Sequence, residues 1–109
     1  MSEKPSPIYS NRADDPAYTH LIDAFVVGVA ERIDHLQDAD SRGDLPLLRS
    51  LAERLHNDAL AVGYDTLART AAEVGAACAE DEGKLAHQGV VALTDLACRI
   101  RLGHRGAMS

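Results

Sequence analysis

The sequence predicts an all-α protein, an antiparallel up-down-up-down bundle of four helices. The chain has one Phe, three Tyr and no Trp among 109 residues, and its abundant Ala, Leu and Val suit helices better than strands. Apolar residues recur at helical spacing in four segments that are separated by turn signals. The expected connections are short, about 2–6 residues, so consecutive helices should pack antiparallel.

The predicted domain organisation is one bundle between two short tails. Residues 1–13 hold two prolines, several serines and little that could pack, so we expect a flexible N-terminal tail. The bundle is expected to span residues 14–103. Residues 104–109 are expected to form a C-terminal tail.

The first helix is expected to begin at Asp15 and Pro16 and to end near Arg42 and Gly43. An aspartate oxygen can cap the first amides of a helix, and a proline at the first helical position has no amide to leave unpaired. The predicted inward face comprises Tyr18, Leu21, Ile22, Phe25, Val26, Val29, Ile33 and Leu36.

The second helix is expected to run from a cap at Asp44, with Pro46 in its first turn, to a stop at Gly63. Proline is tolerated in a first turn, and glycine commonly ends a helix. One apolar stripe follows helical spacing along it. The stripe consists of Leu48, Leu51, Ala52, Leu55, Ala59 and Val62.

A third helix is expected to be capped by Asp65, and the acidic run 80–82 marks the turn to a fourth. Small residues on the third helix imply close approach of a neighbouring helix. Its predicted inner face is Leu67, Ala71, Val74, Gly75 and Cys78. The inner face of the fourth helix is predicted to be Leu85, Gly89, Val90, Leu93, Leu96, Ala97 and Ile100.

The net charge and the short apolar runs of the chain argue against nucleic-acid and membrane partners. The formal net charge of −6 argues against general affinity for nucleic acid or anionic lipid, because both attract positive charge. The longest apolar runs fall far short of the roughly 20 residues that span a bilayer. No apolar leader segment is visible at the N-terminus, so we expect a cytoplasmic protein.

The metal-binding residue types are scattered along the chain, so no metal site and no cofactor are expected. Cys78 and Cys98 lie in no Cys-x-x-Cys pattern, which favours buried, unpaired thiols over a zinc site. The histidines outside the second helix are spread along the chain, without a metal-ligand spacing between them. These are His20, His35, His87 and His104.

One flank of the second helix carries the candidate functional residues. At about 100° per residue, the apolar stripe leaves Arg49, Glu53, His56 and Leu60 together along one exposed flank. Glu53 lies further from the core direction than His56, which is one helical turn later, where the two side chains could pair.

The stretch that contains this flank resembles the motif of the histidine-containing phosphotransfer (HPt) family. That motif is Leu-Ala-His-x-Leu-Lys-Gly, followed by a later glycine and, four residues beyond it, a leucine. The matching positions are Leu51, Ala52, Leu55, Gly63 and Leu67. In this alignment Glu53 stands where the family carries its phosphorylated histidine, and His56 and Asn57 stand at the Lys-Gly positions.

The resemblance implies a four-helix bundle that works in a bacterial two-component phosphorelay. In that family the histidine accepts a phosphoryl group from an aspartyl phosphate on a receiver domain and passes it on. A glutamate is a poor replacement, because it is anionic and an acyl phosphate is no stable store. We therefore expect no enzymatic transfer at Glu53 and a role in binding a response-regulator receiver domain or a hybrid histidine kinase. The expected docking residues are Arg49, Glu53, His56, Asn57, Leu60 and Ala61.

Two alternatives remain open from the sequence. His56 could be a substitute phosphoacceptor, which would make the chain an active phosphorelay intermediate. The exposed flank could instead be a homodimer interface that buries Leu60 in a second copy of the chain.

Overall fold

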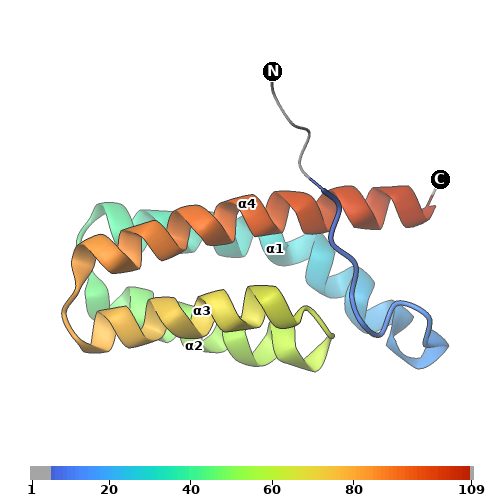
Figure 1. The fold of residues 1–109 in the computed structure, drawn as a ribbon, viewed down its shortest axis with the longest axis horizontal. Coiled ribbons are helices and arrows are strands. Elements are labelled where there is room, and N and C mark those ends of the chain that lie inside the picture. The colour runs from blue at the N-terminus through green and yellow to red at the C-terminus, as the bar shows by residue number, and fades with distance from the viewer. Residues whose placement is uncertain (1–5, 109) are drawn as a thin grey trace, which may run out of the picture.

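The computed structural model describes residues 6–108, with side chains as far as His104, and these residues form a four-helix bundle (Figure 1). The elements are the 3-10 turn η1 (Pro16–Tyr18) and the helices α1 (Thr19–Ser41), α2 (Leu45–Ala61), α3 (Asp65–Ala79) and α4 (Gly83–Met108). Consecutive helices run antiparallel, and each packs against two neighbours in the ring α1–α2–α3–α4. The predicted all-α up-down-up-down bundle is confirmed.

The residues predicted to begin and end the first two helices do so in the structure. The side chain of Asp15 caps η1, which leads directly into α1. Gly43 follows α1 with φ of 69°, a backbone conformation that favours glycine. Asp44 then caps α2 by accepting a 3.2 Å hydrogen bond from the Leu47 amide. Gly63, with φ of 86°, ends α2.

The start of α3 differs from the prediction. Tyr64 is the N-cap residue and makes no side-chain capping bond, whereas Asp65 is the first residue of the helix. The Asp65 carboxylate instead accepts a 2.9 Å hydrogen bond from the Asn11 side-chain amide. It still lies in the first turn, where the helix dipole favours a negative charge.

The predicted inward faces form one continuous core. Its largest fully buried side chains are Leu36, Leu48, Leu55, Leu67, Leu93, Ile100, Val29 and Val74. Two predicted members are wrong, because Leu21 and Leu85 are exposed while Ile22 and Ala86 beside them are buried. A shift of one residue turns a helical position by about 100°, which is enough to move these leucines out of the core.

The small residues of the helix interfaces allow close approach at one place in particular. A Cβ atom added at Gly89 on α4 would overlap Cγ2 of Val74 on α3. The two helices are therefore closer here than a larger side chain at position 89 would permit.

The segment before η1 was expected to be flexible, and its described part is instead held against the bundle. Residues 1–5 lie outside the described residues. In the rest, the Ile8 amide donates to the Arg99 carbonyl at 3.0 Å, and the Arg99 Nε donates to the Ser6 carbonyl at 2.8 Å. The segment thus crosses the later turns of α4 (Figure 1).

Further along, the same segment is bonded to the turn between α2 and α3. The Ser10 hydroxyl is buried and donates to the Val62 carbonyl at 2.5 Å. The Asn11 amide donates to the Gly63 carbonyl at 2.9 Å. These bonds satisfy backbone carbonyls at the end of α2, which otherwise lack partners.

Two glycines make room for this segment. A Cβ at Gly103 would overlap the Ile8 carbonyl oxygen, and a Cβ at Gly63 would overlap the Asn11 side chain. Glycine in α4 and in the α2–α3 turn therefore leaves the space that the N-terminal segment occupies.

The expected C-terminal tail is also different. Helix α4 continues through His104 to Met108, so only Ser109 of the predicted tail 104–109 lies outside the described residues. Gly103 is covered by Ile8 and Tyr9, and His104 pairs with Asp23 of α1. Beyond its predicted end, α4 therefore makes contacts with the N-terminal segment and with α1.

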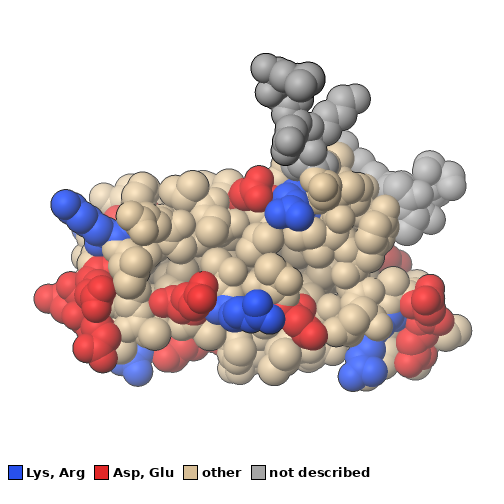
Figure 2. Space-filling view, in the orientation of Figure 1, with Lys and Arg blue, Asp and Glu red and all other residues tan. Residues whose placement is uncertain are grey.

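The surface charges are unevenly distributed. Figure 2 shows acidic side chains gathered at the end of the molecule where the α3–α4 turn lies, which is the exposed run Glu80, Asp81 and Glu82. Over the described part of the chain, no helix combines the length and the apolar character needed to cross a membrane.

Alanine substitutions at two helical glycines test the seating of the N-terminal segment. Gly28→Ala places its Cβ in open space and should stabilise the fold by about 0.5–1 kcal/mol, because alanine is the better helix former. Gly103→Ala should instead cost about 1 kcal/mol or more by displacing Ile8. Urea unfolding measures both, and amide exchange at Ile8 should accelerate only in Gly103→Ala. Equal stabilisation by both variants would contradict the seating of the segment on α4.

Candidate functional site

A shallow groove between α2 and α3 brings together three of the predicted site residues. Arg49, Glu53 and His56 line its α2 side, and its volume is about 290 Å³. The α3 side consists of the small residues Ala72, Gly75, Ala76 and Ala79. The groove therefore has charged and polar side chains along one wall and only alanine and glycine along the other.

Glu53 stands exposed at the rim of this groove. Its side chain is 56% exposed, and its Oε2 accepts a 3.0 Å hydrogen bond from Nε of Arg49 one turn earlier. This ion pair between neighbouring turns of α2 is the type of contact that helical spacing produces. Arg49 therefore balances the charge of the carboxylate and holds it along the axis of α2.

His56 does not pair with Glu53 but turns toward α3. Its ring is half-buried, and Nδ1 lies 2.8 Å from the Ala68 carbonyl oxygen. A carbonyl oxygen can only accept, so Nδ1 must carry the proton and donate it. In the neutral ring Nε2 then keeps its lone pair.

The other three predicted docking residues lie outside the groove lining. Asn57, Leu60 and Ala61 are exposed toward the end of α2, and Leu60 is 53% exposed. The predicted rotation of α2 is confirmed, since Leu48 and Leu55 are buried while this flank faces outward. The flank is thus divided into a polar groove and an adjoining surface around Leu60.

The two cysteines differ from the expected pair of buried thiols. Cys78 is buried, whereas Cys98 is exposed on α4. Burial raises the pKa of the Cys78 thiol, Arg49 opposes this effect and Asp40 adds to it. A thiol with a raised pKa is a weak nucleophile at neutral pH, so Cys78 contributes packing and no reactive group beside the groove.

Three of the histidines are each paired with one carboxylate. His35 lies near Glu31, His87 contacts Asp40 and His104 contacts Asp23. Within residues 6–108, no three side chains of the metal-binding types come together.

Sequence reasoning missed the α3 half of the groove and the partner of His56. The small size of residues 72–79 was visible, but helical spacing alone did not show which of them face Glu53. The Ala68 carbonyl carries no side-chain signal, because every residue offers the same backbone carbonyl group.

The fold and the groove define a four-helix bundle with a charged, exposed flank on α2. No protein-family model matches the chain, and searches of curated proteins and of solved structures find no match either.

Two substitutions on α2 test this orientation. Leu55→Ala should reduce the free energy of unfolding by about 2–5 kcal/mol, because Leu55 is fully buried. Glu53→His should change it by no more than about 0.5 kcal/mol, since it removes only an exposed ion pair. Thermal and urea unfolding provide the measurement. Large and equal losses at both positions would mean that Glu53 is buried.

Proposed function

We propose that the chain is an HPt-like signalling protein that binds a receiver domain, alone or within a hybrid histidine kinase, in a bacterial two-component phosphorelay. One observation carries the proposal. In a four-helix bundle, the residue aligned with the family's phosphorylated histidine, Glu53, is exposed at the rim of a groove. The position is accessible to a partner, and the side chain there is a carboxylate.

Glu53 is poorly suited to accept a phosphoryl group. Its carboxylate is already engaged by Arg49, and it would meet a negatively charged aspartyl phosphate. Transfer between two carboxylates would exchange one acyl phosphate for another without a more stable product. The proposed role is therefore binding, through which the chain would compete with active phosphotransfer proteins for a receiver.

The surroundings of Glu53 favour a transient protein contact. The α3 wall of the groove has small side chains that leave space for a protruding group of a partner. Leu60 adds an exposed apolar side chain on the same flank, and polar rims around small apolar areas are common at non-obligate interfaces. Asn57 occupies the position where the family has glycine, so the partner's approach would differ locally from the family's pose.

A matched pair of leucines tests the docking surface. Leu60 on α2 and Leu85 on α4 are 53% and 52% exposed. Leu60→Glu should weaken binding of a cognate receiver domain by about tenfold or more, whereas Leu85→Glu should leave it unchanged. Calorimetry measures the affinity, and NMR shift mapping with a panel of receiver domains should locate the contact around Glu53.

Three results would contradict the proposal. They are failure of every receiver domain in the panel to bind, shifts confined to α1 and α4, and equal weakening by both leucine substitutions. Sedimentation of the unbound chain tests the homodimer alternative, which requires a dimer that Leu60→Glu dissociates.

A second candidate function, phosphotransfer through His56, is favoured by the hydrogen bond to Ala68. Because Nδ1 donates to that carbonyl, Nε2 of the neutral ring retains the lone pair needed to attack phosphorus. The P–N bond would form as the P–O bond to the receiver aspartate breaks, and the aspartate leaves as a carboxylate. His56 lines the groove, so both candidate functions use the same surface.

Phosphate mapping separates the two functions. If His56 is the acceptor, a phosphorylated receiver should label the wild-type chain with acid-labile phosphate, and His56→Ala should remove the label. Under the binding proposal the wild type remains unlabelled. Glu53→His is the control, because it restores an imidazole at the aligned position and should become labelled if the proposed alignment is correct.

A further inference from the structure

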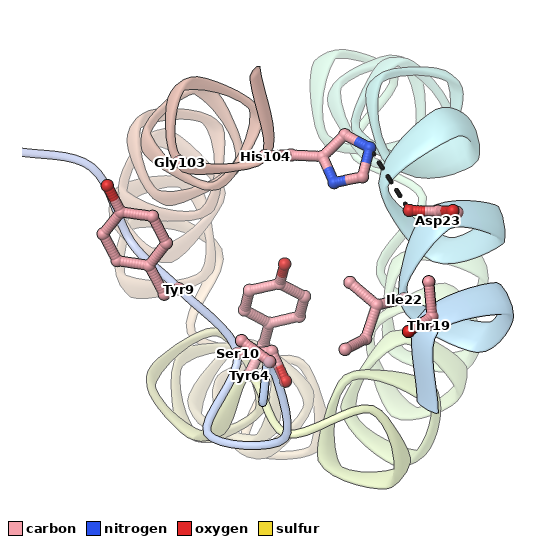
Figure 3. A pocket seen from close by; sticks show the side chains of 9 residues that line it. Tyr9, Ser10, Thr19, Ile22, Asp23, Tyr64, Gly103 and His104 are labelled. Carbon is pink, nitrogen blue, oxygen red and sulfur yellow. Dashed lines mark ion pairs between the residues drawn. The ribbon is translucent and has the colours of Figure 1, made fainter. Parts of the chain in front are cut away.

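A separate cavity of about 250 Å³ lies at the end of the bundle where α1 begins and α4 ends. Tyr9, Ser10 and Ala13 from the N-terminal segment form part of its wall, and the remaining wall comes from α1, α4 and the residue before α3. Figure 3 shows Ile22, Asp23, Tyr64 and His104 around the opening between the helices, whereas the ring of Tyr9 points away from it on the α4 side. The cavity shares no lining residue with the α2–α3 groove.

Tyr64 provides a hydroxyl that faces this cavity. The residue is only 3% exposed, its ring stacks on Phe25 with centroids 5.7 Å apart, and its hydroxyl points into the space between α1 and α4 (Figure 3). Among the hydrogen bonds of the described residues, none involves this hydroxyl. Burial raises the pKa of Tyr64, and the nearby Asp23 carboxylate raises it further, so the hydroxyl stays neutral.

Asp23 supplies the negative charge. Its Oδ1 lies 3.5 Å from Nε2 of His104 (Figure 3), which is longer than an ordinary hydrogen bond. Among the residues whose side chains the structure describes, no lysine or arginine lines the cavity. When His104 is neutral, Asp23 is the one charged group among the described lining residues, and its oxygens remain available to a donor.

We propose that this cavity binds a small organic ammonium ion, a primary amine carrying one ring or a short chain. The ammonium group has three donors and no acceptor, which matches the Asp23 carboxylate and the Tyr64 hydroxyl oxygen. The apolar part of the amine would lie against Ile22 and the aromatic ring of Tyr64. Aromatic rings also attract cations.

The size of the cavity limits the ligand. Its volume of about 250 Å³ is below the roughly 300–1,000 Å³ that is usual for drug-sized molecules. A nucleotide or a peptide would not fit inside the walls. An anion of any size would face Asp23, and the described lining residues include no lysine or arginine to compensate. Ligand class and size thus follow from the same set of lining residues.

NMR titration of the intact chain with benzylamine tests the proposal, with benzyl alcohol and benzoate as isosteric neutral and anionic probes. At about pH 8, benzylamine should produce saturable shifts at the amides of Asp23, Tyr64 and His104. Benzyl alcohol and benzoate should bind at least about tenfold more weakly. Non-saturable shifts, or equal or tighter binding of either control probe, would overturn the proposal.

Two variants with the same change of net charge test whether Asp23 is the residue that binds the ammonium group. Asp23→Asn should weaken benzylamine binding by about tenfold or more, because it removes a charge-assisted hydrogen bond. Glu31→Gln, on the same helix but exposed and away from the cavity, should leave the affinity unchanged. Tyr64→Phe should weaken it to a smaller degree. Equal affinities of wild type and Asp23→Asn, with an unchanged amide spectrum elsewhere, would overturn the proposal.

Discussion

The rotation of α2 about its own axis is the constraint on which the rest of this structure depends. It is set by the burial of one stripe, of which Leu48, Ala52, Leu55 and Ala59 are inaccessible or nearly so. Each buried leucine contributes about 1.5–3 kcal/mol relative to an exposed one. A rotation of about 100° would expose part of this stripe and bury the charge of Glu53. Burial of an unpaired charge is strongly unfavourable, so this rotation would destabilise the bundle. Glu53 and Leu60 therefore face outward because the core holds the opposite face.

Most of the fold was predictable because the signals that specify it are local. The apolar spacing of α2 and the caps at Asp15 and Asp44 operate within one or two helical turns. Failures occurred where distant residues decide the outcome. Asp65 does not cap α3, because it is already the first residue of the helix, and its carboxylate is bonded to Asn11 instead. The N-terminal segment is ordered by bonds to α4 and to the α2–α3 turn. Leu85 was misplaced because apolar character alone does not resolve a single step around a helix.

The same division applies to the candidate sites. The Arg49–Glu53 pair joins residues four apart on one helix, so sequence spacing was enough to bring the two together. The contact of His56 with the Ala68 carbonyl depends on the separation of α2 and α3. The end cavity was beyond sequence reasoning, because Asp23, Tyr64 and His104 come from three elements and meet only when the bundle closes.

The first turn of α3 connects these two regions. Tyr64 contributes its ring to the cavity, and its carbonyl accepts the Ala68 amide at 3.0 Å. The Ala68 carbonyl, in turn, accepts a hydrogen bond from Nδ1 of His56. The N-terminal segment holds the beginning of this turn through Asn11, whose amide is bonded to Gly63 and whose side chain is bonded to Asp65. The orientation of the imidazole in the groove and the shape of the cavity at the end of the bundle therefore rest on one helical turn, which is anchored by a segment more than 50 residues earlier in the chain.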